Sequence, residues 1–503
     1  MGGFTILVTR ALEGILAVVF TIVVARLIGA RGFGMVGIAL SLIAVFQAVG
    51  RFGIPEAIAR FVPKYSVQKR WGMVRSVLRE SFKYILILAL GISGALAVLA
   101  SPIATYIYHD PGLTTLFRVA ALVLFFSLLL GGFQGSFQGF QRMRYILLTQ
   151  LSYHVFRIVA AVVFITLGIF ATGALLGVAA GFAIACGISL FFLLPRVLPK
   201  RRSRRTEKEE GLSKEILHFS VPLWLGVIGG ILMIYLGPLI LGRVVRIEEV
   251  GYYTAAFSIS IFSAELPGSM GMALFPAVSE RWTLGDKRGF SAAIGATLKL
   301  IYIVLTPLVV AGIFFSKFVM SLLYGAGFVA GANVLCVLLV AFLLYSLASV
   351  NISILNGIGC SGAGAKAWWS GAGAGVVAIT ILAWTHGAMG AAVGLGLGMG
   401  ISAILGAYFF IRLTGVRYPF HVFWRPLLAS GAMLLFLLPM RWVVWSAPLA
   451  VLAGVGGLLI YLYAFLKLGG IGTEDIKVLR RLSSGMGRPR VLERAIRFLE
   501  RYV

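Results

Sequence analysis

ARLIGARGFGMVGIALSLIAVFQAVGRFGIPEAIARFVPKY (residues 25–65) joins the end of one apolar helix, a Gly-rich turn, a second apolar helix and a basic segment that contains proline. A weaker copy occupies residues 239–281, which read LILGRVVRIEEVGYYTAAFSISIFSAELPGSMGMALFPAVSER. The copies share small residues, a serine and a proline at matched or nearly matched spacing: Gly29 and Gly242, Gly34 and Gly251, Ala39 and Ala256, Ser41 and Ser258, Pro63 and Pro276. Because an internal repeat fixes architecture, the copies predict two related halves.

The composition is that of a membrane protein. Hydrophobic residues make up 60% of the 503 residues and charged residues 12%, and the mean hydropathy is +0.99. One soluble core cannot hide that much apolar surface, so lipid must be the solvent. The net charge of +27 comes from basic residues at the ends of apolar segments. That distribution is typical of membrane topology and of contact with anionic membrane lipids, and it argues against nucleic-acid binding.

Long apolar runs without period-2 alternation predict an all-α, polytopic membrane protein with about 14 transmembrane helices. The N-terminal run continues to Ile28 without a small-residue cleavage site, so we interpret it as the first span rather than a signal peptide. The predicted spans are 6–28, 33–53, 82–107, 113–138, 145–169, 172–195, 216–242, 250–279, 289–315, 331–357, 364–385, 388–412, 421–440 and 443–467.

The distribution of Lys and Arg among the connecting loops predicts the orientation. Basic residues are concentrated in the loop 54–83, in residues 196–214 and in the tail 469–503, all on one side of the predicted membrane. The loops of the other side hold only Arg31, Arg243, Arg246, Lys317 and Arg441. Because positive loops stay inside, both termini are expected in the cytoplasm and the protein in the cell membrane.

The charged stretch PRVLPKRRSRRTEKEEGLSK (195–214) is too polar to pack and is interpreted as a flexible linker. It divides the chain into an N-terminal six-helix lobe, a basic cytoplasmic linker, a C-terminal six-helix lobe, two additional transmembrane helices and a basic amphipathic tail. The predicted ranges of these five parts are 1–195, 196–214, 215–413, 414–468 and 469–503. The tail favours a helix resting on the inner leaflet, with the docking of a partner as the alternative.

No enzyme signature is present. The sequence contains no HExxH, no P-loop and no GxSxG after a strand, so we expect no catalytic residue, metal or cofactor. GLGLGMG (394–400) lies inside an apolar span, where it indicates close helix packing rather than a phosphate site. Cys186, Cys336 and Cys360 lie in or beside apolar runs without a CxxC pair and are interpreted as packing residues.

Ionisable residues at membrane depth are the candidate functional groups, because a charge there costs several kcal/mol unless it is paired or faces a wet cavity. The candidate substrate-binding cations are Arg157, Lys299, Arg26, Arg51, Arg118 and Arg10, and the candidate ion-coupling acids are Glu265 and Glu13. Alternatives are that cations near helix ends extend to headgroups, that Arg10 pairs with Glu13, and that Glu265 neutralises a nearby base. The excess of cations predicts a basic cavity that suits a phosphate or pyrophosphate.

Several segments, taken together and in order, resemble the Wzx-type polysaccharide flippases, in the superfamily that also holds multidrug antiporters and lipid II flippases. They are ARLIGARGFG (25–34), GIPEAIARFVP (53–63), LGRVVRIEEVGYYTAAFSIS (241–260), LFPAVSE (274–280), LLYGAGFVAGANVLCVL (322–338), LNGIGCSGAGAK (355–366) and GAMGAAVGLGLG (387–398). The resemblance implies two six-helix lobes in a V around a central cavity. It also implies transport of a polyprenyl-(pyro)phosphate-linked oligosaccharide to the outer leaflet by alternating access.

The resemblance further implies that a proton or sodium gradient can drive transport and that membrane lipids, and glycan-assembly proteins, are partners. Relatives often carry an acid just before the LG of the seventh span, where YLGPLILG has Gly237. Because that acid is missing here, Glu265 and Glu13 become the candidate residues for ion coupling. Alternatives are a multidrug antiporter of the same fold, which favours an acidic cavity, a lipid II-type flippase, and a membrane glycan polymerase or transferase. The last class normally needs a large outer loop with acidic or His residues, which is missing from residues 316–330.

Overall fold

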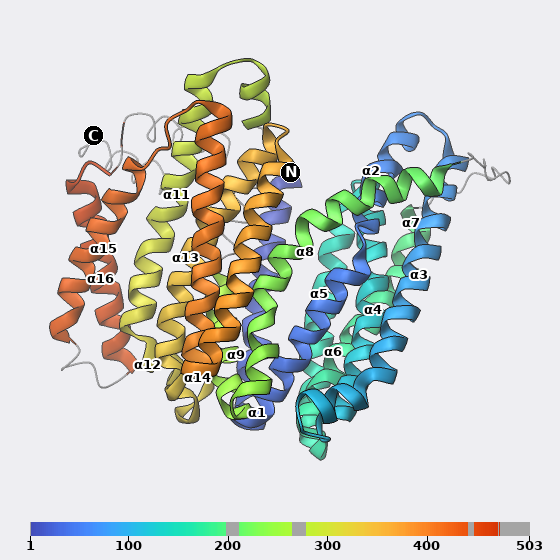
Figure 1. Ribbon diagram of the computed structural model, residues 1–503, viewed down its shortest axis with the longest axis horizontal. Helices are drawn as coiled ribbons and strands as arrows, with labels where there is room; N and C mark the ends of the chain where they lie inside the picture. Colours follow the sequence, from blue (N-terminus) through green and yellow to red (C-terminus); the bar gives the residue numbers. More distant parts are fainter. Residues whose placement is uncertain (1, 198–210, 264–277, 441–446, 471, 473–503) are drawn as a thin grey trace.

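Two helical bundles stand side by side in the computed structural model, which describes residues 2–197, 211–263, 278–440, 447–470 and 472. Every regular element in those ranges is a helix. The bundles meet at the lower end of Figure 1 and diverge toward its upper end, with α1, α8 and α9 between them. The predicted all-α, two-lobed membrane fold is therefore confirmed.

The quoted stretch 25–65 folds as the centre of this arrangement. Helix α1 (Gly2–Arg51) consists of two helical halves joined at Gly29, whose φ of 70° breaks the helical path. Residues with a side chain rarely adopt this conformation, so a glycine is needed at the turn. The two halves correspond to the predicted spans 6–28 and 33–53. They descend and ascend between the two bundles in Figure 1.

Helix α2 (Ile54–Val67) follows after a second left-handed glycine, Gly53, with φ 69°. The expectation of a basic loop over residues 54–83 misses this helix. Its buried residues recur at helical spacing on one face, and they pack against α3 (Trp71–Pro102) and the first turns of α8: Ile54, Ala57, Ile58, Phe61, Val62 and Tyr65. The opposite face keeps basic residues in solvent, so α2 is an amphipathic helix at the upper end of the N-terminal bundle.

The rest of the N-terminal bundle matches its predicted spans closely. After α3 the chain continues through a short π-helix and then α4 to α7, with two more π-helical stretches inside. The bounds are Ile103–Ile107, α4 Leu113–Gly139, α5 Met143–Phe164, Ile165–Ile169, α6 Phe170–Gly187, Ile188–Leu193 and α7 Leu194–Val197. Small residues bring α5 and α6 together, because a Cβ on Gly177 would lie 2.5 Å from the Cα of Ala161.

The C-terminal bundle begins with two helices that also contact the other lobe. Its elements are α8 (Leu212–Val244), α9 (Ile247–Phe262), α11 (Lys287–Phe314), α12 (Ser316–Tyr324), a 3₁₀ turn (Ala326–Gly331), α13 (Ala332–Gly357) and α14 (Ser361–Thr414). Helix α14 reverses at Gly387, where φ is 57°, in the same way as α1 reverses at Gly29. The first turns of α8 pack on α2 and α3 through Leu212 and Ile216. The predicted domain limit at residue 215 stays a prediction.

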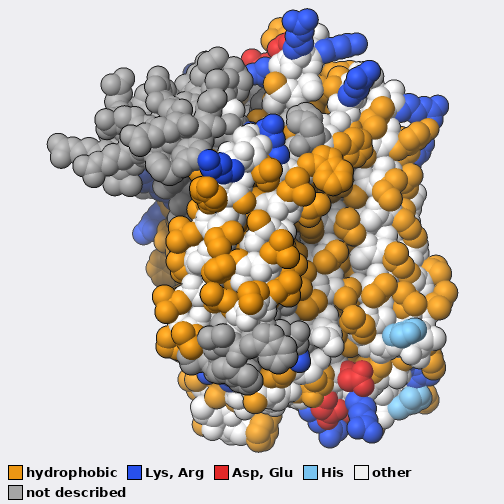
Figure 2. All heavy atoms as spheres, turned by 90° about the vertical axis from the view of Figure 1, so that its left-hand side faces the viewer, with side chains coloured by type: hydrophobic (Ala, Val, Ile, Leu, Met, Phe, Trp, Pro, Cys, Tyr) orange, Lys and Arg blue, Asp and Glu red, His pale blue; other side chains and the backbone are white. Residues whose placement is uncertain are grey.

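The two additional helices form a unit of their own at the left of Figure 1. Helices α15 (His421–Met440) and α16 (Ala447–Lys467) bury Met433, Leu437 and Tyr461 in a small separate core. The Tyr461 hydroxyl donates to the Ile303 carbonyl of α11 at 2.8 Å, which attaches the pair to the C-terminal bundle. Figure 2 shows a belt of hydrophobic side chains across this face, with Lys and Arg at its upper and lower ends. Such a belt is the surface that lipid requires.

Nine helices of the described part are long and apolar enough to cross a membrane. Three of them, Leu12–Arg51, Met143–Arg196 and Ser361–Thr414, contain 40 to 54 residues and reverse direction inside. One crossing takes about 20 residues, so each of these three supplies two. The count of 14 stays a prediction, because the span 250–279 extends into residues outside the described part. Most of the linker 196–214 and of the tail 469–503 also lies outside it.

Candidate functional site

A cavity of about 1030 Å³ lies between the two bundles, on the side where they diverge. It is lined by α2, α8, α13 and α14: Arg60, Phe61, Glu215, His218, Phe219, Gly230, Ile231, Ile234, Tyr345, Ser349, Ile352, Ser353, Asn356, Ser361, Gly362, Ala365 and Trp368. Elements of both lobes therefore contribute to one space. Its volume is at the upper end of the range for sites that hold small molecules.

One wall of this cavity is a neutral polar stripe on α13. Tyr345, Ser349, Ser353 and Asn356 recur at intervals of three or four residues, which places them on one face of an otherwise apolar helix. The stripe runs from Tyr345 to Asn356, which is about 16 Å along the helix axis. Hydroxyl and amide groups at this depth can exchange hydrogen bonds with the hydroxyls of a sugar.

Aromatic rings lie beside the stripe. The rings of Tyr345 on α13 and Trp368 on α14 are 5.8 Å apart between centroids, and both residues line the cavity. Trp368 belongs to a short cavity-facing row on α14 with Ser361 and Ala365 at helical spacing. Rings with an apolar body and a polar edge suit ligands that are apolar on one face and polar on another.

The charged groups of the described lining are on α2 and on the first turns of α8. The guanidinium of Arg60 lies 4.2 Å from the centre of the Phe219 ring, and its other side remains exposed. Lys64 donates to Glu215 at 3.0 Å, which ties α2 to α8. This hydrogen bond raises the pKa of the Lys64 ammonium above its usual value. The site therefore pairs a neutral wall in the C-terminal lobe with a charged rim at the junction of the lobes.

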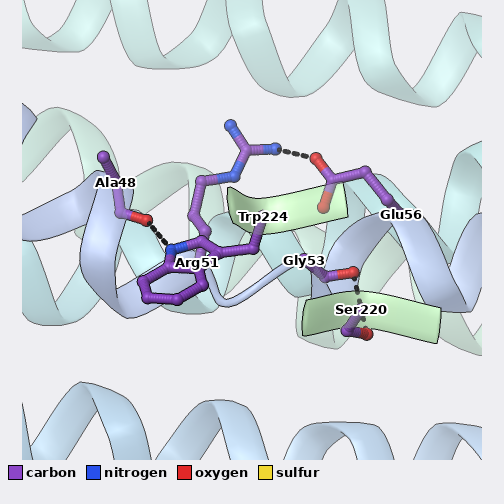
Figure 3. A network of polar contacts seen from close by, with 6 residues as sticks. All are labelled: Ala48, Arg51, Gly53, Glu56, Ser220 and Trp224. Carbon is purple, nitrogen blue, oxygen red and sulfur yellow. Dashed lines mark hydrogen bonds and ion pairs between the residues drawn. The ribbon is translucent and has the colours of Figure 1, made fainter. Parts of the chain in front are cut away.

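The junction itself is a network of polar contacts between α8 and the end of α1 (Figure 3). The indole N–H of Trp224 donates to the Ala48 carbonyl at 2.7 Å, and the Ser220 hydroxyl donates to the Gly53 carbonyl at 3.2 Å. A Cβ on Gly53 would lie 2.5 Å from the Ser220 carbonyl oxygen, so glycine permits this approach as well as the positive φ. We call these contacts of Ala48, Gly53, Ser220 and Trp224 the α8 junction.

At the opposite end the lobes meet through glycines. A Cβ on Gly34 of α1 would overlap the Ile247 carbonyl oxygen of α9, and a Cβ on Gly251 of α9 would overlap the Ala30 carbonyl oxygen. Gly34 and Gly251 are matched positions of the internal repeat, and each contacts the backbone four residues before the other. The repeat thus forms a reciprocal contact, which is how two copies related by a twofold axis meet.

Arg26 strengthens this end of the molecule. Its Nε donates to the Leu323 carbonyl at 2.8 Å, and its Nη2 donates to the Leu322 carbonyl. Both carbonyls belong to the last turn of α12, where a cation complements the negative end of the helix dipole. Arg26 therefore links the first half of α1 to the C-terminal lobe.

None of the predicted site residues is among the described residues that line the large cavity. Arg51 is exposed and pairs with Glu56 at 3.0 Å. Arg118 is exposed on α4, and Lys299 is partly buried on α11. None of these is among the described residues of the cavity lining. Their roles in binding substrate stay predictions.

Arg157 is buried inside the N-terminal bundle, 8% exposed, and it too lies apart from the described cavity lining. Glu13 is partly buried in the first half of α1. Glu265 lies outside the described residues, and so does the side chain of Arg10. No group of three His, Cys, Asp or Glu side chains in the described part could hold a metal ion.

Gly237 packs tightly, since a Cβ there would lie 2.6 Å from the Tyr253 hydroxyl oxygen. The ring of Tyr253 therefore occupies the space next to the position where the resemblance leads one to expect an acid. The residues that sequence reasoning missed are Arg60, His218, Tyr345, Trp368 and the serines of α13. The serines of α13 are polar residues at helical spacing in a mostly apolar span, a signal that the cost of burying charge does not reveal.

Comparison with known proteins places this chain among membrane transporters. A family profile described as "Polysaccharide biosynthesis protein" matches residues 1–282, which is more than half of the chain. The lipid II flippase MurJ of Bacillus subtilis is 22% identical over 395 residues, covering 71% of this chain and 72% of that protein. A provisionally named O-antigen transporter of Shigella flexneri is 22% identical over 185 residues, 37% of this chain and 44% of that protein.

Among solved structures, the lipid II flippase MurJ in an inward closed conformation superposes with a TM-score of 0.72 at 15% sequence identity. The superposition covers 91% of this chain and 98% of that one. At this identity the likeness concerns the fold, which is that of a two-lobed transporter.

Proposed function

This chain belongs to the polysaccharide biosynthesis protein family, and we propose that it moves a polyprenyl-(pyro)phosphate-linked oligosaccharide from the cytoplasmic to the outer leaflet of the cell membrane. It is a membrane transporter rather than an enzyme, as its named relatives are. The proposed route is alternating access, in which the cavity between the lobes opens first to one side and then to the other.

The proposal rests on one observation: the cavity has neutral polar and aromatic side chains on one wall and charged side chains on its rim. The wall on α13 and α14 offers neutral hydroxyls, an amide and two aromatic rings, which is the chemistry that sugars require. The rim offers the exposed guanidinium of Arg60, whose fork geometry matches phosphate oxygens. In the proposal the glycan occupies the wall, the phosphate group contacts the rim, and the lipid tail stays in the bilayer.

The positions of these groups fit entry from the cytoplasm. Arg60 belongs to α2, which lies near the upper end of Figure 1, and α2 is part of the basic segment 54–83 that predicts a cytoplasmic face. The stripe on α13 then leads inward from Asn356 to Tyr345. At the far end, the reciprocal glycine contact and Arg26 close the path. We propose that this arrangement is the inward-facing state of the transport cycle.

The proposal also includes the coupling of transport to an ion gradient. Glu13 and Glu265 stay the candidate coupling acids, and Tyr253 fills the space beside Gly237. A multidrug antiporter for cationic compounds would need free acids in the cavity. In the described lining the only carboxylate is that of Glu215, and Lys64 already pairs with it. This observation favours a glycan-bearing substrate without positive charge over a cationic drug.

The test is a strain of the native host that lacks the protein. We expect lipid-linked oligosaccharide to accumulate on the cytoplasmic leaflet, where it is protected from an enzyme or lectin added outside. The wild-type gene should restore export, whereas Trp368→Ala and Arg60→Gln should restore far less at equal protein levels. Trp384→Ala is the matched control, because that tryptophan is 67% exposed on α14 and absent from the described lining.

Two results would contradict the proposal. One is a normal leaflet distribution of all lipid-linked glycans in the strain without the protein. The other is the stalling of the peptidoglycan precursor alone, which would identify a lipid II-type flippase. Increased sensitivity to cationic drugs with normal glycan export would instead support the antiporter.

A further inference from the structure

The N-terminal lobe contains a second, smaller cavity of about 210 Å³, separate in its lining from the cavity between the lobes. Four helices of this lobe, α1, α4, α5 and α6, supply its walls: Gln47, Arg51, Ser127, Leu130, Gly131, Gln134, Gln150, Tyr153 and Phe182. Three amide side chains, a hydroxyl, a phenol and a guanidinium therefore surround a small space inside an apolar bundle. Polar groups at membrane depth are costly and usually functional.

A buried cation lies directly behind this cavity. Nη1 of Arg157 donates to the Tyr153 phenol oxygen at 2.9 Å. The guanidinium lies 4.3 Å from the ring centre of Phe20 and 5.0 Å from that of Tyr153. The side chain is 8% exposed, and no carboxylate pairs with it in the described part of the chain.

Several buried side-chain nitrogen atoms in this region have no hydrogen-bond partner. They are Nε and Nη2 of Arg157, Nε2 of Gln134 and Nδ1 of His154. A buried donor without a partner costs about 1–3 kcal/mol, and a buried charge without a partner costs more. Rings beside the guanidinium supply only part of the missing stabilisation. The excess of donors and of positive charge therefore needs an acceptor that carries negative charge.

Tyr153 connects the cation to the cavity. Because its oxygen accepts a hydrogen bond from Arg157, its own O–H is free to donate, and the neighbouring cation strengthens that donor. Gln134 adds an unpartnered N–H from α4, and Arg51 adds a second guanidinium from the end of α1. Glu56 contacts Arg51 at 3.0 Å, and both side chains of this pair are exposed.

We propose that this cavity binds a small inorganic anion of the size of chloride or phosphate. The anion would accept hydrogen bonds from Tyr153 and Gln134, and it would neutralise Arg157 through a medium of low dielectric constant. A volume of about 210 Å³ has room for such an ion with a few waters, at about 30 Å³ each, but not for an oligosaccharide. This anion site is distinct from the proposed glycan cavity and does not depend on it.

The site has a structural consequence for the N-terminal lobe. Phe20 belongs to the first half of α1, whereas Gln47 and Arg51 belong to the second half, so the cation and the cavity together contact both sides of the hairpin. An anion bound there would hold α1 against α4 and α5. The folded lobe should therefore be more stable when the anion is present, because a ligand that binds only the folded state stabilises it.

The experiment uses the purified full-length protein in a neutral detergent, at constant ionic strength and pH. Sodium gluconate, whose anion is larger than chloride and phosphate, is replaced stepwise by sodium chloride or by sodium phosphate, and thermal unfolding is followed. We expect a saturable rise of several degrees with at least one of the small anions. Bromide, used as a heavier probe, should give anomalous scattering density beside Tyr153 and Gln134 in crystals.

Variants distinguish anion binding at this cavity from a general effect of salt on the unfolding temperature. Arg157→Gln and Gln134→Leu should abolish the anion-dependent rise, whatever they do to stability in gluconate. Arg118→Gln removes an exposed cation from α4 of the same lobe and should leave the rise unchanged. Tyr153→Phe provides a second variant at the cavity if Arg157→Gln does not fold.

Three outcomes would overturn the proposal. The first is the absence of any saturable difference between chloride, phosphate and gluconate in the wild-type protein. The second is an equal rise in the wild type, Arg157→Gln and Gln134→Leu, which would indicate a non-specific salt effect. The third is stabilisation by phosphatidylglycerol in phosphatidylcholine nanodiscs without small anions, lost in Arg157→Gln, which would assign the site to a lipid headgroup.

Discussion

Gly34 and Gly251 face each other across the two lobes, and a Cβ on Gly34 would lie 2.9 Å from the amide nitrogen of Gly251. Both residues belong to the internal repeat, at matched positions of residues 25–65 and 239–281. The contact therefore joins equivalent helices of the two halves at the end opposite the basic loops. Any side chain at either position must push the halves apart.

Gly34→Ala should weaken this contact. Overpacking against backbone costs about 1–3 kcal/mol, and the strain is relieved when the lobes separate at this end. We expect a lower thermal unfolding temperature and faster hydrogen exchange at residues 30–36 and 247–253. The control is Gly94→Ala on α3, where a Cβ would meet nothing within 4 Å and where alanine favours the helix. Equal destabilisation by both variants would contradict the role of the contact.

Arg26→Gln should weaken the contact between the lobes at the same end of the molecule, through the loss of hydrogen bonds rather than through overpacking. The variant loses the charged donor to the carbonyls of Leu322 and Leu323, a loss of about 1–2 kcal/mol for exposed charged hydrogen bonds. Hydrogen exchange at the last turn of α12 should therefore accelerate. Arg31→Gln, which removes an exposed cation from the next turn of the hairpin, should leave that exchange rate unchanged. Unchanged exchange in Arg26→Gln would refute the link.

Trp224→Phe tests the α8 junction. The change keeps a ring against Phe52, whose centroid lies 4.9 Å away, but removes the N–H that donates to Ala48, at a cost of about 1 kcal/mol. We expect the two lobes to separate more readily at the basic-loop end, measured as the distance distribution between spin labels on α2 and α14.

Trp369→Phe is the matched control for the junction. Its indole N–H donates to the Leu225 carbonyl at 2.8 Å, one residue after Trp224, but that bond lies within the C-terminal lobe. The control should cost similar stability without changing the distance between the lobes. A similar broadening of the distances in both variants would argue against a junction between lobes.

The ion pair of Lys64 and Glu215 predicts a particular pH dependence. Because the hydrogen bond raises the pKa of Lys64 in the folded protein, the contribution of the pair is fully present below the usual value of 10.5 and is lost as the pH rises through the raised value. The stability difference between wild type and Lys64→Met should therefore be constant from about pH 6 to pH 9, and at most about 1 kcal/mol for so exposed a pair.

The same difference should shrink with added salt, which screens exposed charges. The measurement is thermal unfolding of both proteins over this pH range at two ionic strengths. A difference that changes within this pH range would show that a second titrating group acts on the contact.

Much of the fold could be predicted because it follows from local chemistry. Long apolar runs define the spans. A glycine between two such runs, such as Gly29, marks where the chain reverses. Helix α2 was missed because its buried residues lie in a segment with many basic side chains. The spacing of Ile54, Ile58, Phe61 and Tyr65 already indicated an amphipathic helix.

The candidate site could be predicted only in part. Arg157 is predicted to be a charge at membrane depth, and the structure buries it inside the N-terminal bundle. Sequence position cannot tell whether such a residue faces the space between lobes or the interior of one lobe. The cavity wall depends on how α13 and α14 are rotated about their axes, which tertiary packing decides. The serines of α13 carry no charge, so the cost of burying a charge does not identify them as functional candidates.

Helix α8 belongs to both lobes at once, so one continuous helix connects them. Its 33 residues follow about 50 Å of helix axis, and the helix bends on its way from one lobe to the other in Figure 1. Its first turns contact Gly53 and Ala48, and its middle carries Ile234 into the cavity. A bound molecule that shifts the middle of α8 by an ångström or two therefore also acts on the α8 junction, without any signal having to pass through the basic linker.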